Sequence, residues 1–326
     1  MVNKSDCVLV IGGGSIGERH ISNLLAAGYS QVAVLRKRNL PFRNSALQSV
    51  RVVTTEMEAL ALNPKAAVIC TPTSLHLSQS IWCLENGMHV LAEKPLSHTL
   101  DDWHLLENSV KSSGKLLYVG YMMRFHPLVK VIKEKIESEE LGHLLSFTSH
   151  WGEYLPNWHP WEDYKTSYAA QAHLGGGASL TLSHDLDIVN YLVGKPLTKY
   201  FCLQNHASNL EVTADAGADF LMEYENKTTG HVHVNYFEQP ANRFLHLVFD
   251  KGRIEFYYFK NELKIITPNQ EEVLLAENFD RNQLFVSELE YFFSLANSTM
   301  PQSVSESMLQ ESETIIRMCM NKPLSK

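Results

Sequence analysis

The feature that most constrains the fold is a glycine pattern near the N-terminus. Gly12, Gly14 and Gly17 form G-x-G-x-x-G directly after the apolar run CVLVI and directly before a segment with the composition of a helix. Between a strand and a helix, the first glycine permits a tight turn, the second lets the backbone approach a diphosphate, and the third allows close helix packing. The pattern therefore predicts a strand–turn–helix unit with a dinucleotide at the helix N-terminus.

The pattern of hydrophobic residues differs between the first part of the chain and the rest. Over the first part, short runs that are apolar throughout alternate with helical segments, which predicts a parallel sheet covered on both faces. Period-two strands dominate the rest, as in HVHV (231–234), where histidines fall on one face and valines on the other. The predicted fold class is α/β: an N-terminal Rossmann dinucleotide-binding domain (1–122) and a C-terminal α+β domain (123–326) with a large antiparallel-rich sheet, ending in helices at about 281–296 and 303–320.

Composition argues against several classes of protein. With 28 basic and 36 acidic residues, a net charge of -8 and no basic run, the chain is not expected to bind nucleic acid. Its five cysteines are widely spaced, which favours a reducing compartment. The N-terminal apolar run is too short for a secretory signal or a membrane span, so we expect a cytoplasmic protein without a membrane partner. His231 and His233 share a strand face but lack a third ligand, so no metal is expected.

A basic cluster follows the second predicted strand. Arg36-Lys37-Arg38 stands about 20 residues beyond the glycine loop, where a carboxylate usually binds the adenosine ribose. A guanidinium there would face a 2′-phosphate, which favours NADP over NAD as the cofactor and counts against a methyltransferase. The alternative is a solvated basic turn.

Three stretches resemble a known family of oxidoreductases. They are GGGSIGERH, TPTSLH (71–76) and GMHVLAEKPL, which delivers Glu93-Lys94-Pro95 at the end of an apolar strand. Together they resemble the glucose-fructose oxidoreductase and inositol dehydrogenase (Gfo/Idh/MocA) family over nearly the whole chain. The resemblance implies that Lys94 lies between nicotinamide and substrate as the main proton-transfer residue, and that the Lys94–Pro95 bond is cis. With the glycine pattern and the basic cluster, it gives the expected cofactor contacts: Gly12, Gly14, Ser15, Ile16, Gly17, Arg36, Thr71, Pro72, His76, Glu93 and Lys94.

A second motif of the family is matched only in part. The run GGGASLTLSHDLD resembles a glycine turn that leads to an aspartate, a histidine and a further aspartate, and His184 and Asp187 match its last two positions. Thr181 stands where many members carry the catalytic aspartate, and a threonine cannot accept a proton from lysine. Either His184 does the proton work with Lys94, helped by Asp185 or Asp187, or catalysis is weak. A structural role for His184 stays open.

Residues 153–168 are rich in aromatic side chains set among charged groups, a mixture that suits the faces and edges of a sugar. The alternative is a packing loop between domains. The resemblance is looser here and points to a branch concerned with sugar nucleotides or surface polysaccharides. The expected substrate contacts are Arg124, His126, Tyr154, Trp158, Trp161, Tyr164 and Asp187.

The sequence therefore predicts an NAD(P)-dependent oxidoreductase that transfers hydride between nicotinamide and a hydroxyl or keto carbon of a sugar or sugar-nucleotide-like substrate. We also expect a homodimer or homotetramer formed through the C-terminal sheet. Two alternatives remain: a non-catalytic, dinucleotide-dependent sugar sensor, and a reductase of a non-sugar carbonyl or tetrapyrrole.

Overall fold

The computed structural model describes residues 1–37 and 40–324, which form two compact units. The first contains Met1–Gly120 together with Phe285–Glu313, and the second contains Tyr121–Leu284 together with the chain from Thr314 onward. The division after Gly120 lies close to the expected domain boundary. Residues 285–313, however, which the sequence placed in the second domain, pack with the first unit. The ring of Phe293 lies 4.5 Å from that of Tyr29, which gives this segment an apolar partner there.

The first unit contains a six-stranded parallel sheet in the order β3-β2-β1-β4-β5-β6. Val8, Val10, Val68 and Val90 have no exposed surface, as expected for strands covered on both faces. This arrangement confirms the predicted Rossmann sheet. The strands are β1 (Cys7–Ile11), β2 (Gln31–Leu35), β3 (Arg51–Val53), β4 (Ala66–Ile69), β5 (His89–Glu93) and β6 (Leu117–Gly120).

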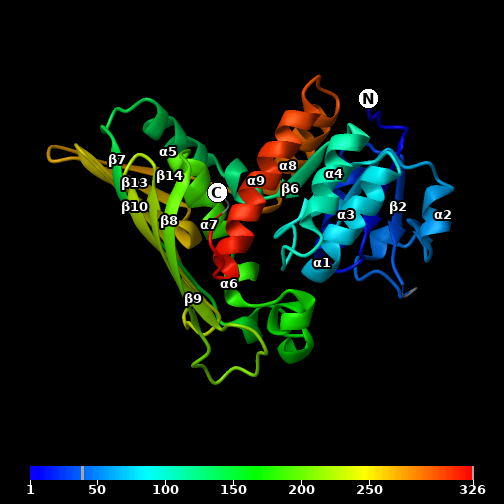
Figure 1. The fold of residues 1–326 in the computed structure, drawn as a ribbon, viewed down its shortest axis with the longest axis horizontal. Helices are drawn as coiled ribbons and strands as arrows, with labels where there is room; N and C mark the ends of the chain where they lie inside the picture. The colour runs from blue at the N-terminus through cyan, green and yellow to red at the C-terminus, as the bar shows by residue number, and fades with distance from the viewer. Residues whose placement is uncertain (38–39, 325–326) are drawn as a thin grey trace. The chain divides into compact units, whose positions relative to one another are not determined.

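α-Helices connect β1 to β2 and each consecutive pair of strands from β3 to β6 (Figure 1). Ile21 and Leu24 of α1 are fully buried. Because the strand order changes direction between β1 and β4, the carboxyl ends of these two strands are where sheets of this kind bind ligands. The helices of this unit are α1 (Ser15–Ala26), α2 (Glu56–Leu60), α3 (His76–Glu85) and α4 (Trp103–Ser113), with α8 (Asn282–Ala296) and α9 (Pro301–Cys319) extending into it.

The second unit contains an eight-stranded sheet in the order β14-β13-β12-β11-β7-β10-β9-β8. Only the β7–β10 pairing is parallel among the described strands of this sheet, which confirms the predicted antiparallel-rich sheet. The strands are β7 (Leu144–Gly152), β8 (Leu197–Asn205), β9 (Gly217–Tyr224), β10 (Thr229–Asn235), β11 (Asn242–Phe249), β12 (Gly252–Tyr257), β13 (Glu262–Ile266) and β14 (Glu271–Leu275).

One face of this sheet carries helices. α7 (His184–Val193) packs on β7 and β10, and α6 (Ala178–Thr181) packs on β9 and β10, while α5 (Pro127–Glu137) packs against α7 (Figure 1). In β10, Val232 and Val234 are buried and His231 and His233 are half-exposed, so the predicted alternation is confirmed.

Candidate functional site

The three glycines of the loop after β1 meet different steric conditions. Gly12 has a φ of +101°, and a Cβ there would lie 2.7 Å from the carbonyl oxygen of Cys70 at the end of β4. A Cβ at Gly17 would overlap the carbonyl oxygen of Gly12, so the helix can approach the turn only without a side chain. Nothing lies within 4 Å of the corresponding position at Gly14. Space for a ligand is therefore open at Gly14 alone of these three.

The N-terminus of α1 begins at this open glycine. Gly14 is the N-cap residue, and no side chain among the described residues caps it. Ser15 is exposed and Ile16 is half-buried, so the first turn can be reached from solvent. Uncapped N–H groups and the positive end of the helix dipole favour an anion such as a diphosphate. The residues present therefore fit the dinucleotide that the glycine pattern predicts.

Arg36 leaves the end of β2 and lies against the glycine loop. A Cβ at Gly13 would be 3.0 Å from Cδ of Arg36, and the guanidinium lies 4.2 Å from the centre of the Phe42 ring. Its Nε is buried without a hydrogen-bond partner among the described residues. The side chain is thus held beside the loop by an aromatic ring and carries a donor that a phosphate could satisfy. Lys37 is exposed, and Arg38 lies outside the described residues.

A buried carboxylate holds the segment that carries Phe42. Glu18, in the first turn of α1, accepts hydrogen bonds from the backbone N–H groups of Arg43 at 2.9 Å and Asn44 at 3.0 Å. The segment after β2 is therefore tied to the same helix whose N-terminus faces the glycine loop.

Two further loops leave the carboxyl ends of β4 and β5. Thr71 and Pro72 follow β4, and the Thr71 hydroxyl donates to Oε1 of Gln79 at 2.6 Å. Lys94 follows β5, is half-buried, and precedes Pro95 through a cis peptide bond, as predicted. Both loops stand at the edge of the sheet where open α/β folds place their ligands.

Glu93, which ends β5, pairs with a histidine of α1. Its Oε1 lies 3.0 Å from Nε2 of His20, which has no exposed surface. Burial acts to raise the pKa of the Glu93 carboxyl, but the hydrogen bond and charge of His20 and the charge of Lys94 lower it overall. Glu93 is therefore a carboxylate fixed in place from α1.

In the second unit, α7 begins with His184 and presents two buried carboxylates. Asp187 has no exposed surface and binds Arg124 through two hydrogen bonds, Nε to Oδ2 at 3.0 Å and Nη2 to Oδ1 at 2.5 Å. Asp185 accepts from Nη2 of Arg243 at 2.6 Å and from the Ser149 hydroxyl at 2.7 Å. Each of the two carboxylates is thus paired with an arginine.

His184 lies between aromatic rings. Its ring centre is 6.0 Å from that of Tyr121 and 6.2 Å from that of Trp151, and the residue is 5% exposed. Thr181, at the end of α6, is also buried. The glycine turn before α6 is stabilised by Asp215, whose carboxylate accepts from the backbone N–H of Ser179 at 2.8 Å.

The expected substrate contacts differ in exposure. Trp161 is 64% exposed, whereas Tyr154, Trp158 and Tyr164 are half-buried. Trp158 packs edge-on against Tyr236, and the Tyr164 hydroxyl accepts from the backbone N–H of Glu211. These contacts hold the segment against other parts of the second unit and leave Trp161 accessible.

His126 is buried at the beginning of α5. It is 2% exposed, its Nδ1 accepts from the backbone N–H of Leu128 as the N-cap of α5, and its ring packs 4.5 Å from that of Phe279. Burial lowers the pKa of His126 to about 4. His126 and Asp187 both hold elements of the second unit together, and their contact with substrate stays a prediction.

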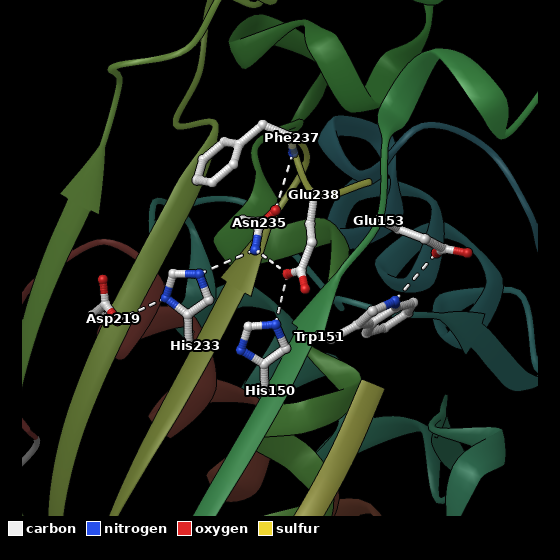
Figure 2. Close-up of polar contacts among 8 residues, drawn as sticks. All are labelled: His150, Trp151, Glu153, Asp219, His233, Asn235, Phe237 and Glu238. Carbon is white, nitrogen blue, oxygen red and sulfur yellow. Dashed lines mark hydrogen bonds and ion pairs between the residues drawn. The ribbon is translucent and has the colours of Figure 1, made fainter. Parts of the chain in front are cut away.

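A polar network lies on the sheet face opposite the helices (Figure 2). His231 and His233 both bind Oδ1 of Asp219, at 2.9 and 2.7 Å. Figure 2 continues the network through Asn235 to Glu238, whose Oε2 lies 2.6 Å from Nε2 of His150. Among the described residues, no group of three or more His, Cys, Asp or Glu side chains is arranged to hold a metal ion.

Two family models match the chain. One, described as "Oxidoreductase family, NAD-binding Rossmann fold", matches residues 7–121, and the other, "GFO/IDH/MocA C-terminal domain", matches residues 129–255. The chain belongs to the Gfo/Idh/MocA family. The resemblance stated from the sequence motifs is thus confirmed, and the first unit of this Gfo/Idh/MocA protein has the NAD-binding type of Rossmann fold.

Several curated proteins are similar in sequence to part of this chain. The "Uncharacterized oxidoreductase YrbE" of Bacillus subtilis (strain 168) is 30% identical over 199 residues, 59% of this chain and 55% of that protein. The scyllo-inositol 2-dehydrogenase (NAD(+)) of the same organism is 31% identical over 204 residues, 58% of this chain and 54% of that protein. The chain thus matches about half the length of these curated relatives. A solved levoglucosan dehydrogenase in complex with NADH has the same fold, with a TM-score of 0.81, 18% identity and 97% of both chains covered.

Sequence reasoning missed several residues that hold these elements in place. Glu18, His20, Asp215 and Arg243 are all buried, and each binds a partner far from it in the chain. A buried polar residue has no periodicity of its own, so a single sequence carries no signal that pairs them. In the part of the chain that the structure describes, no helix is long and apolar enough to cross a membrane.

Proposed function

We propose that this protein is a nicotinamide-dependent oxidoreductase that interconverts a hydroxyl and a keto group on a sugar or sugar-nucleotide-like substrate. The observation that carries the proposal is the pairing, in one unit, of an open glycine loop with a lysine at the end of β5. Gly14 leaves space at an uncapped helix N-terminus, and Lys94 follows β5 at the ligand-binding edge of the sheet.

The bound nicotinamide would supply or accept the hydride. For oxidation, Lys94 in its neutral form takes the proton of the reacting hydroxyl as the carbon loses its hydride. For reduction, the Lys94 ammonium returns that proton to the carbonyl oxygen. A positioned acid–base group of this kind contributes about 10²–10⁴-fold to rate. His184 is the second proposed proton-transfer residue, since Thr181 cannot hold a charge and Asp185 and Asp187 bind arginines.

The proposed cofactor is NADP in preference to NAD. Support comes from the guanidinium of Arg36, which lies beside the glycine loop on the Phe42 ring and has a buried Nε without a partner among the described residues. An arginine fork binds a phosphate through paired, charge-assisted hydrogen bonds. Because salt screens an exposed pair of this kind, the expected preference is about tenfold.

The half-exposed and exposed aromatic residues 154–168 support the substrate class. Aromatic rings cover the apolar face of a sugar, and neighbouring polar groups can bind its hydroxyls. The proposed contacts are Tyr154, Trp158, Trp161 and Tyr164. Arg124 is a further proposed contact, and Asp187 holds its guanidinium in place.

The test is a panel of free sugars and sugar nucleotides, assayed with each oxidised and reduced cofactor by nicotinamide absorbance. Turnover on one class is expected, and Lys94→Ala should lower it by about a hundredfold or more while changing the dissociation constant for the cofactor much less. Cofactor binding without turnover on any sugar would instead support a sensor. Wild-type turnover by Lys94→Ala would refute the proposed catalytic role.

We also propose a homodimer or homotetramer formed through the open sheet face of the second unit. Phe201, Leu203 and Leu221 are more than half exposed, and Phe201 lies directly opposite Leu221 in the β8–β9 register. These side chains share the face with the polar network of Figure 2. Apolar side chains around a satisfied polar centre suit an interface between copies of one chain. Sedimentation should show an oligomer at micromolar concentration, and a monomer there would contradict the proposal.

A further inference from the structure

One buried histidine connects the two loops that carry the proposed chemistry. His76 begins α3 and is 2% exposed. Its Nδ1 lies 2.8 Å from the carbonyl oxygen of Pro95, and its Nε2 lies 2.7 Å from the carbonyl oxygen of Thr71. Both acceptors are backbone atoms, so the ring fixes the path of the two loops and not a side-chain rotamer.

The two loops come from neighbouring strands of the sheet. Thr71 follows β4, directly after Cys70, whose carbonyl oxygen restricts the glycine turn at Gly12. Pro95 follows Lys94 after β5. A single imidazole therefore spans the distance between a loop beside the dinucleotide turn and the loop of the proposed catalytic lysine.

The residues directly before and after Lys94 each contact a buried histidine. Glu93, before it, binds His20 of α1, and Pro95, after it, binds His76 of α3. Burial lowers the pKa of His76 although both carbonyl groups and Glu93 act to raise it. A neutral ring has two tautomers and donates to Pro95 in one and to Thr71 in the other, so both loops depend on the same ring.

We infer that His76 is a positioning residue that couples the dinucleotide loop at Thr71 to the lysine loop at Pro95, so that bound cofactor and Lys94 keep a fixed separation. This inference rests on the proposed function. Since a displacement of about 1 Å at a reacting group can cost about a hundredfold in rate, a side chain that sets this separation affects turnover without touching the substrate.

Two substitutions at His76 each keep one of its two backbone contacts and remove the other. The amide nitrogen of asparagine can occupy about the position of Nδ1, and that of glutamine about the position of Nε2. His76→Asn therefore keeps a donor for Pro95, and His76→Gln keeps one for Thr71. We expect His76→Gln to lower kcat by about tenfold or more with a nearly unchanged dissociation constant for NADH and NADPH. His76→Asn should show the reverse: a raised dissociation constant and a kcat closer to wild type.

The matched control is His89→Gln. His89 lies on β5, is 8% exposed, and accepts from the backbone N–H of Leu116 at the opposite end of the strand from Lys94. It should lower the melting temperature as the His76 variants do, while kcat and cofactor affinity stay at wild-type values.

The outcomes distinguish this inference from the proposed function. Cofactor affinity is measured by fluorescence titration of NADH and NADPH, which requires no substrate. Equal effects of His76→Asn and His76→Gln on both parameters, or the same effects in His89→Gln, would overturn the positioning role while leaving the proposed enzyme intact. Failure of the wild-type protein to bind either dinucleotide would refute the proposed function itself.

Discussion

Replacing Gly12 and Gly14 separately by alanine tests whether the glycine loop is built for its own turn or for a ligand. At Gly12, the added Cβ would lie 2.7 Å from the Cys70 carbonyl oxygen, 0.7 Å inside the 3.4 Å at which ordinary contacts begin (3.4 − 2.7), at a φ of +101°. At Gly14, the φ is −78° and nothing lies within 4 Å. The two substitutions add the same methyl group to opposite steric conditions.

The expected magnitudes follow from these conditions. Gly12→Ala combines backbone strain of about 1–3 kcal/mol with overpacking of about 1–3 kcal/mol, so the free energy of unfolding should fall by about 2–6 kcal/mol. Gly14→Ala should change it by less than about 1 kcal/mol, because a weaker N-cap is offset by the reduced entropy of the unfolded chain. If the diphosphate approaches Gly14, loss of one charge-assisted hydrogen bond worth about 1.5–3 kcal/mol raises the dissociation constant for NADH or NADPH at least tenfold.

Urea unfolding followed by circular dichroism measures the first quantity, and fluorescence titration of the reduced cofactors measures the second. The reasoning is refuted if Gly14→Ala binds the cofactors as tightly as wild type, because the space at Gly14 would then face no ligand. A stable Gly12→Ala protein would refute the steric part.

Three further predictions concern other sites. Arg36→Asp should remove the preference for NADPH over NADH in titrations at low salt, and an unchanged ratio would exclude Arg36 as the phosphate contact. His126 and His89 are buried with pKa values lowered to about 4, chiefly by burial, against about 6.5 in the unfolded chain. The unfolded state therefore binds more protons between these values, and the free energy of unfolding should fall by about 1.4 kcal/mol per pH unit for each histidine as pH drops from about 6.5 to 4. His126→Gln should show a shallower slope in urea unfolding across that range, and an identical slope would argue against a buried neutral His126. Asp187→Asn removes the charge of a fully buried carboxylate that pairs with Arg124, whose side chain is 12% exposed, and should lower the free energy of unfolding by about 3–5 kcal/mol. A changed KM at unchanged stability would instead support the predicted substrate contact at Asp187.

Local patterns in the sequence predicted most of the first unit. Each parallel strand is an apolar run bounded by turn residues, and the glycine spacing specifies a turn whose geometry depends on a few adjacent residues. The same holds for Lys94, because a residue that directly follows a parallel strand lies at the ligand-binding edge whatever the rest of the chain does. The alternation in β10 likewise identified its buried and open faces.

The tertiary structure decided which polar groups meet. His20 and Glu93 are 73 residues apart, and Asp185 and Arg243 are 58 apart, so their pairing depends on packing that periodicity does not report. Nor does periodicity report that His126 caps α5 or that Asp187 pairs with Arg124, 63 residues away. The sequence also placed residues 285–313 with the second domain, whereas they pack with the first unit, where the ring of Phe293 contacts that of Tyr29. The steric limits on a turn depend on neighbouring residues, so a short sequence pattern can show them. A buried polar group instead takes its partner from whichever element the completed core brings beside it.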